Sequence, residues 1–200
     1  MFKQVEISDE ILFKYGAEVK TYQKDEYLAH MGGDPKSIIY VYSGAVKIIT
    51  LNEEGDEYLH GFNYANEIIG IGTYFGGNAY YNDFIAIEEV VTRELSLDNF
   101  EKMMKENFEI SRSIIKYLSD ILELKTLTLT AVLGKSPRDK IIFLLDRIKK
   151  YIFKNEQGMV PFTRQELANS LGMRVETVIR TIKELEDEGI VTIEKGKIFY

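Results

Sequence analysis

The 200-residue sequence predicts an α+β fold in three parts: a β-rich domain at 1–106, a long helix at 107–134, and a small helical domain with a hairpin at 135–200. Three observations lead to this prediction. Short runs of β-branched and aromatic residues alternate with turn residues as far as position 97. An apolar pattern with helical spacing comes next. The segment after position 162 then contains two further helix patterns, each of which ends at a glycine.

The β-rich domain contains short runs that favour strands. Their β-branched and aromatic content predicts strands at 27–31, 38–42, 45–51, 58–62, 67–71, 84–87 and 90–97. Turn signals such as Ser43-Gly44 and Gly76-Gly77-Asn78 separate the runs. Short strands at this regular spacing are typical of a small antiparallel barrel or jelly roll.

A short capped helix is expected at 98–105, and the long helix after it carries two apolar stripes. The first stripe consists of Ile110, Ile114, Tyr117, Ile121, Leu124, Thr128 and Ala131, and the second of Phe108, Ile115, Leu118, Leu122, Leu129 and Val132. Two stripes predict two buried faces, one against the barrel and one against another helix. Because the first stripe has the alternating spacing of a coiled-coil seam, we expect a homodimer through Ile114, Tyr117, Ile121 and Leu124. A helix buried within a single chain is the alternative.

The segment Lys135-Ser136-Pro137 interrupts this pattern and predicts a hinge. Ser136 is expected to cap a new helix that has Pro137 at its first position and extends to about 153. The apolar residues that this helix should pack into the C-terminal domain are Ile141, Ile142, Leu144, Leu145 and Ile148.

The C-terminal segment predicts a helix-turn-helix followed by a hairpin. Thr163 and Glu166 form a capping-box pattern that begins a helix ending at Gly172. A second helix is expected at 175–188 and ends at Gly189, and two apolar runs then flank Lys195-Gly196-Lys197. An apolar seam should join the two helices through Leu167, Ala168, Leu171, Val178 and Ile182. This order is typical of a winged helix-turn-helix, whose second helix enters the major groove of DNA.

The polar residues of this segment are suited to nucleic acid. The second helix should expose Arg174, Glu176, Thr177, Arg180 and Lys183. An arginine can bind guanine through two hydrogen bonds and a glutamate can accept from cytosine, so Glu176 and Arg180 are candidates for base reading. An ordinary surface ion pair between these two residues is the alternative. Candidate phosphate contacts are Thr163, Arg164 and Gln165 at the first helix and Lys195 with Lys197 on the hairpin.

The composition narrows the function classes. The formal net charge of −7 divides into −10 for 1–134 and +3 for 135–200, so the candidate DNA-binding part is the basic one. The chain has no cysteine, and His30 and His60 are its only histidines. We therefore expect no metal site, no resident cofactor and no enzyme activity. No apolar stretch of 18 residues occurs, so we expect a cytoplasmic protein without a signal peptide or a membrane partner.

Three motifs give the chain a resemblance to a known family. They are YLAHMGGDPKSIIYVYSGAVKIITLNEEGDE, SPRDKIIFLLDRI and FTRQELANSLGMRVETVIRTIKELEDEGIV. In these segments the chain resembles the cyclic-AMP receptor/fumarate-nitrate regulator (CRP/FNR) family. The resemblance implies a jelly-roll sensor domain similar to cyclic-nucleotide-binding domains, a dimerisation helix and a winged helix-turn-helix. It further implies a homodimeric transcription factor that responds to an effector and contacts RNA polymerase when it activates.

The expected effector site departs from the family pattern. Cyclic-AMP-binding members have Gly-Glu and Arg-Ser pairs, where this chain has Gly70-Ile71 and Tyr80-Tyr81. No Lys or Arg occurs between Lys47 and Arg93, which disfavours a bound phosphate. We place the candidate pocket at Gly70, Ile71, Tyr80, Tyr81, Leu124 and Thr128. The many aromatic residues suit an apolar or aromatic small molecule, or else they simply fill the barrel. A cyclic-nucleotide response stays open as an alternative, as does a sensing or protein-interaction module that binds DNA only weakly.

The second helix resembles the fumarate-nitrate subgroup, because Val175 precedes Glu176-Thr177 where the cyclic-AMP type has arginine. The resemblance implies a palindrome with TTGA-like half-sites about 10 base pairs apart, read through Glu176 and Arg180. Val175 is a candidate for contact with a thymine methyl group. Ile179 stands where that subgroup has serine, so the resemblance does not fix the base preference at one position.

Overall fold

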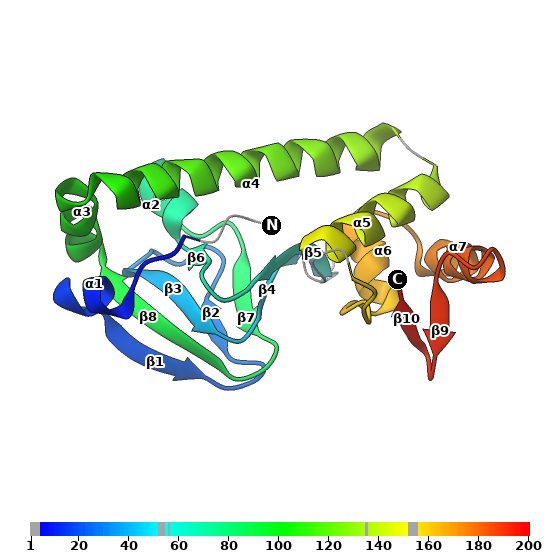
Figure 1. The fold of residues 1–200 in the computed structure, drawn as a ribbon, viewed down its shortest axis with the longest axis horizontal. Helices are drawn as coiled ribbons and strands as arrows, with labels where there is room; N and C mark the ends of the chain where they lie inside the picture. The colour runs from blue at the N-terminus through cyan, green and yellow to red at the C-terminus, as the bar shows by residue number, and fades with distance from the viewer. Residues whose placement is uncertain (1–4, 52–54, 56, 135, 152–155) are drawn as a thin grey trace. The chain divides into compact units, whose positions relative to one another are not determined.

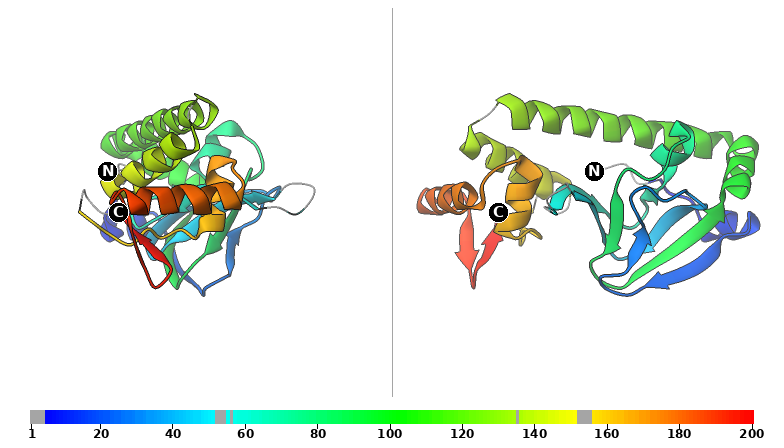
Figure 2. Two further views of the ribbon diagram at one scale, coloured as in Figure 1. Left: turned by 90° about the vertical axis from the view of Figure 1, so that its right-hand side faces the viewer. Right: turned by 180° about the vertical axis from the view of Figure 1, so that it is seen from behind.

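The computed structural model describes residues 5–51, 55, 57–134, 136–151 and 156–200, and the side chains of 127, 131, 132, 134, 150 and 151 lie outside this description. The chain divides into two compact units, Lys3–Asp120 and Ile121–Tyr200, and each is described by itself. Figure 1 labels the elements, and Figure 2 shows them from two further sides.

The first unit is a jelly roll. Its elements are α1 (Asp9–Lys14), β1 (Glu18–Tyr22), β2 (Tyr27–Ala29), β3 (Ser37–Ser43), β4 (Val46–Leu51), β5 (Glu57–Asn63), β6 (Ile68–Ile69), α2 (Ile71–Gly76), β7 (Asp83–Ala86), β8 (Val90–Ser96), α3 (Leu97–Glu106) and the first half of α4 (Phe108–Gly134). In the described residues the strands form two antiparallel four-stranded sheets, ordered β1-β8-β3-β6 and β2-β7-β4-β5. Each predicted strand has its counterpart, and the short capped helix is α3, with Ser96 as its N-cap.

Three elements of this unit were not predicted, namely α1, β1 and α2. The strand β1 pairs with β8 from Glu18↔Glu94 to Tyr22↔Val90, but it lies at the sheet edge and is exposed along most of its length. An exposed edge strand needs no apolar run, so its sequence signal is weak. The predicted strand at 67–71 ends at Ile69 because Gly70, with a φ of 90°, turns the chain into α2.

The two sheets enclose an apolar core, and one glycine at a corner is required by a close approach. The core residues are Ile39, Val41, Val46, Ile69, Tyr80, Phe84, Ala86 and Val90. Gly44 has a φ of 87°, and a Cβ atom placed on it would lie 2.4 Å from the carbonyl oxygen of Glu89. The Ser43-Gly44 corner therefore packs against the β7–β8 connection too closely for any other residue.

The long helix α4 has two apolar faces, as predicted, but the face assigned to the dimer is the one whose first residues are buried against the barrel. Ile110, Ile114 and Tyr117 are buried, and the hydroxyl group of Tyr117 accepts a 3.4 Å hydrogen bond from the backbone amide of Ile68 in the barrel. Ile114 and Tyr117, expected in the dimer seam, are 0% and 2% exposed and have no surface left for a second chain. Ile121 and Leu124 are half-buried.

The other face of α4 is exposed. Phe108, Ile115, Leu122, Leu129 and Leu133 are each more than half exposed, and the first four follow one another at intervals of seven residues. We call these five residues the α4 stripe. Ala131 and Val132, predicted in the two stripes, lie outside the described side chains.

The second unit contains α5 (Pro137–Tyr151), α6 (Arg164–Leu171), α7 (Val175–Asp187), β9 (Thr192–Glu194) and β10 (Lys197–Phe199), after the second half of α4. Ser136 caps α5, since its Oγ accepts a 3.2 Å hydrogen bond from the backbone amide of Asp139. The predicted hinge residue Lys135 and the predicted end of α5 at Phe153 lie outside the described residues. One core joins these elements, and it includes Ile141, Leu145, Ile148, Leu167, Ala168, Leu171, Val178 and Ile182, with Ile142 and Leu144 packed against it.

Candidate nucleic-acid interface

The first helix of the pair, α6, begins at a complete capping box. The backbone amide of Glu166 donates to Thr163 Oγ1 at 3.1 Å, and the amide of Thr163 donates to Glu166 Oε2 at 2.7 Å. Thr163 is therefore committed to the cap. The amides of Arg164 and Gln165 lie in the first turn and have no partner within the helix, so they are the groups available to a phosphate.

A tight turn places α7 against α6. Gly172 adopts the left-handed conformation (φ 58°, ψ 44°), and its amide donates to the carbonyl oxygen of Ala168. Ala168 and Val178 are both fully buried at the contact between the helices. Because alanine is small, α7 can cross α6 closely. Arg174 is the N-cap of α7, and its side chain makes no capping hydrogen bond, so it extends into solvent beside the helix N-terminus.

The helix α7 has one buried face and one exposed polar face. Val178, Thr181, Ile182 and Leu185 are buried. Glu176, Arg180 and Lys183 are exposed, and Thr177 is half-buried. Val175 is also half-buried and packs against the core of the unit, which leaves less of it for a base than we expected. We call Glu176, Ile179, Arg180 and Lys183 the reading face.

The charges of the reading face are balanced by the following turns of α7. Arg180 Nε lies 3.9 Å from Glu184 Oε1, so the ion pair of Arg180 in the structure is with Glu184 and not with Glu176. Both side chains are more than half exposed, so this pair holds Arg180 only weakly. Lys183 contacts Glu186 at 2.7 Å and Asp187 at 3.4 Å, and the hydrogen bonds to these carboxylates raise the pKa of Lys183. Lys183 is more than half exposed as well, so both basic side chains can turn toward another partner.

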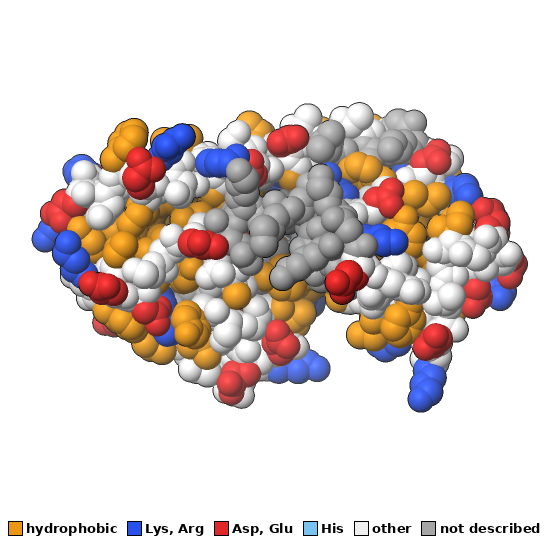
Figure 3. All heavy atoms as spheres, viewed as in Figure 1, with side chains coloured by type: hydrophobic (Ala, Val, Ile, Leu, Met, Phe, Trp, Pro, Cys, Tyr) orange, Lys and Arg blue, Asp and Glu red, His pale blue; other side chains and the backbone are white. Residues whose placement is uncertain are grey.

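The hairpin forms a wing with a basic tip. Lys195 and Gly196 both have positive φ (47° and 79°), as in a two-residue turn between paired strands. Arg164 Nη1 donates to the carbonyl oxygen of Gly196, which connects the start of α6 to the wing. Lys195 and Lys197 are exposed, and basic atoms stand out at the end of the hairpin in Figure 3. Arg164 therefore positions the wing in addition to any contact of its own.

The candidate effector residues are only partly brought together. Gly70 and Tyr80 are adjacent, because a Cβ on Gly70 would lie 3.1 Å from the Tyr80 hydroxyl group. Tyr80 is buried and packs edge-on against Phe84 at 5.8 Å between ring centroids, whereas Tyr81 is 61% exposed. Ile71 is buried. Leu124 and Thr128 belong to the other compact unit.

A buried carboxylate beside Tyr80 was missed by the sequence analysis. Glu94 of β8 accepts hydrogen bonds from Tyr22 Oη (2.6 Å), Lys20 Nζ (2.9 Å) and Ser37 Oγ (2.9 Å). Burial opposes its ionisation, but these donors hold the pKa of Glu94 below its ordinary value. Burial, together with the charge of Glu94, raises the pKa of Tyr80 to about 12. The only sequence signal is the alternation of β8, which puts Thr92 and Glu94 on the same side as the core residue Val90.

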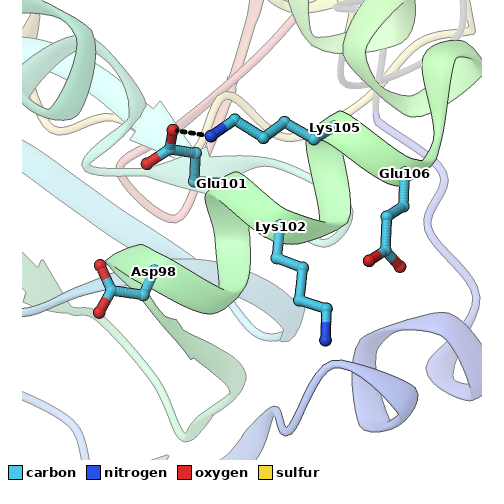
Figure 4. A pocket seen from close by; sticks show the side chains of 5 residues that line it. All are labelled: Asp98, Glu101, Lys102, Lys105 and Glu106. Atoms are coloured by element: carbon cyan, nitrogen blue, oxygen red, sulfur yellow. Dashed lines mark ion pairs between the residues drawn. The ribbon is translucent and has the colours of Figure 1, made fainter.

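The described residues contain few other candidates. An open groove on α3 is lined by Asp98, Glu101, Lys102, Lys105 and Glu106 (Figure 4). Its side chains carry charges of both signs, and Glu101 pairs with Lys105 at 2.6 Å, so part of the charge is already compensated. In the described part of the chain no three His, Cys, Asp or Glu side chains gather into a metal site. None of the described helices has the length and apolar character that a bilayer crossing requires.

Both units are similar to known protein families. Residues 19–107 match the family model of the cyclic nucleotide-binding domain, and residues 140–199 match the Crp-like helix-turn-helix domain. The transcriptional activator protein anr of Pseudomonas aeruginosa is 27% identical over 196 residues, which span 95% of this chain and 78% of that protein. The fumarate and nitrate reduction regulatory protein of Yersinia pestis is 25% identical over 183 residues, or 89% of this chain and 72% of that one. The c-di-GMP responsive global regulator CLP of Xanthomonas campestris shares the fold, with a TM-score of 0.79 at 18% identity over 95% of this chain and 98% of that chain.

Proposed function

Because this chain belongs to the CRP/FNR family of DNA-binding transcriptional regulators, we propose that it binds a palindromic site with TTGA-like half-sites as a homodimer. The observation that carries the proposal is the reading face of α7. The opposite face of this helix is completely buried, so the domain core holds Glu176 and Arg180 outward in a defined orientation. In the major groove the guanidinium group of Arg180 donates to guanine, and Glu176 accepts from cytosine.

The phosphate contacts come from around this helix. The first-turn amides of Arg164 and Gln165, the side chain of Arg174 and the wing lysine Lys195 are the donors we assign to the DNA backbone. Thr163 acts indirectly, because it caps α6. Such contacts position the domain on the duplex, and the bases are read by α7 alone.

A homodimer explains the exposed α4 stripe. Four of its residues repeat at intervals of seven, which is the length of the heptad repeat in a coiled coil. An exposed apolar row of this length on a helix is unfavourable in water unless a second surface covers it. A second copy of the same helix presents the same row. The two half-sites of a palindrome match the two-fold symmetry of such a dimer, and as an activator the dimer would also contact RNA polymerase.

The interior of the jelly roll does not favour a cyclic nucleotide as the effector. The position next to Gly70 is taken by the ring of Tyr80, and the nearby carboxylate of Glu94 would repel a phosphate. The effector chemistry that suits this interior is an apolar or aromatic small molecule that competes with Tyr80 for the space beside Gly70.

The proposal is tested by selecting DNA from a random pool with the purified protein, and then measuring binding of the selected site and a scrambled site by Arg180→Ala. We expect a TTGA-type palindrome, and we expect Arg180→Ala to lose about 1–3 kcal/mol on that palindrome with little change on the scrambled site. Arg112→Ala is the matched control, because it removes one exposed positive charge from the jelly-roll unit. An equal loss on both sites would mean that Arg180 only contacts phosphate. Salt-sensitive binding without any selected sequence would favour a sensing or protein-interaction module.

A further inference from the structure

One residue of the reading face is apolar. Ile179 lies one turn after Glu176 and one turn before Lys183, and its exposed fraction is 50%. Among the described residues of α6, α7 and the wing, it is the only large hydrophobic residue that is exposed. Single exposed hydrophobic residues are common on protein surfaces, so the position of this residue, and not its exposure, has to decide its role.

The domain core does not need Ile179. The core side of α7 is already occupied by Val178, Ile182 and Leu185, which are at most 1% exposed. The neighbouring apolar residue Val175 packs against this core, whereas half of Ile179 extends away from it. Because isoleucine is β-branched, its side chain is nearly fixed in a helix and can be presented to a ligand with little loss of conformational freedom.

The chemistry of an aliphatic side chain limits what Ile179 can recognise in the major groove. It neither donates nor accepts a hydrogen bond, so it gains nothing from the polar edges of guanine, cytosine or adenine. Thymine alone presents an apolar group there, its C5-methyl group. Ile179 and Arg180 both belong to the exposed reading face of α7, so a duplex bound there meets both side chains.

We propose that Ile179 is a specificity-determining residue that packs against a thymine methyl group, so that each half-site requires T·A at one position. This inference rests on the proposed function of α7. Ile179 takes the place of Val175 as the residue that contacts the methyl group, because Val175 packs against the domain core.

The test replaces each thymine of the selected half-site, one at a time, with uracil, which lacks only the methyl group. We expect one position at which the wild-type protein binds the uracil duplex about fourfold more weakly, the loss that corresponds to about one buried methyl group. Ile179→Ser should bind the thymine and uracil duplexes equally at that position. Ile179→Val is the matched control, since its branched side chain keeps most of the contact and should retain a preference for thymine.

The outcomes separate this inference from the proposal on which it rests. A selected palindrome that depends on Arg180, with no position sensitive to uracil, would overturn the role of Ile179 and leave the function of α7 intact. An equal uracil penalty in the wild type and in Ile179→Ser would also overturn it, because another group would then contact the methyl. A uracil penalty that Ile179→Ser abolishes and Ile179→Val retains supports it. Circular dichroism of the variants should be unchanged because the side chain lies outside the core.

Discussion

The buried carboxyl group of Glu67 predicts that the stability of the jelly roll depends on pH near neutrality. Glu67 lies between β5 and β6 and is 7% exposed. Its Oε2 accepts a 2.8 Å hydrogen bond from Asn63 Nδ2. Burial raises the pKa of Glu67 to about 7, although the hydrogen bonds from Asn63 and from the Tyr64 backbone oppose the rise. The nearby phenols of Tyr64 and Tyr117 have pKa values raised by burial and stay protonated in this range.

The sign and size of the effect follow from the two pKa values. The ordinary value of 4.5 applies to the unfolded chain, and about 7 applies to the folded one. The folded state therefore binds the proton more tightly, and its advantage is complete below 4.5 and is lost as the pH rises to 7. Since one pKa unit corresponds to about 1.4 kcal/mol, the loss amounts to about 3 kcal/mol.

The variant Glu67→Gln tests this reasoning, because it keeps the shape of the side chain and removes the ionisation. Its free energy of unfolding in urea should match that of the wild type at about pH 4 and exceed it by up to about 3 kcal/mol at about pH 8. The matched control is Glu109→Gln, which changes an exposed carboxyl group of α4 in the same unit. If the stability curves of wild type and Glu67→Gln stay parallel between these pH values, Glu67 does not titrate near neutrality and the reasoning is refuted.

Three further substitutions test the dimer, a corner and a cap. Leu122→Glu puts a charge in the α4 stripe and should weaken self-association by about tenfold or more in sedimentation equilibrium. The control Ser113→Glu, also exposed on α4, should leave self-association unchanged. An unchanged mass for Leu122→Glu would rule out the stripe as the interface. Gly44→Ala should lower the free energy of unfolding by more than about 2 kcal/mol, because its Cβ would meet a backbone oxygen at 2.4 Å. The control Gly77→Ala also has a positive φ, but its Cβ would enter open space, so it should cost about 1 kcal/mol. Equal losses in the two variants would contradict the clash at Gly44. Thr163→Ala should lower the stability measured by thermal unfolding by about 1 kcal/mol, because it removes the α6 cap. Thr163→Ser keeps the capping hydroxyl group and should retain the wild-type stability. A loss in Thr163→Ser equal to that in Thr163→Ala would argue against the cap.

The helix-turn-helix was predictable because its signals are local. The capping box, the glycine after α6 and the Lys195-Gly196 turn each act within a few residues, and the structure contains all three. The edge strand β1 was not predictable in the same way, because its partner β8 is about seventy residues away and its own side chains are mostly exposed.

The sequence by itself determined the order of the parts, the positions of nearly all strands and the two helices of the DNA-binding candidate, since these depend on periodicity, caps and turns along the chain. Only the tertiary structure decided which stripe of α4 packs on the barrel, since both stripes are apolar and the choice depends on contact with residues such as Ile68. It also decided that Val175 packs inward while Ile179 extends outward. In each case the choice depends on core residues that are distant in the chain, and a local sequence pattern contains no information about where those residues lie.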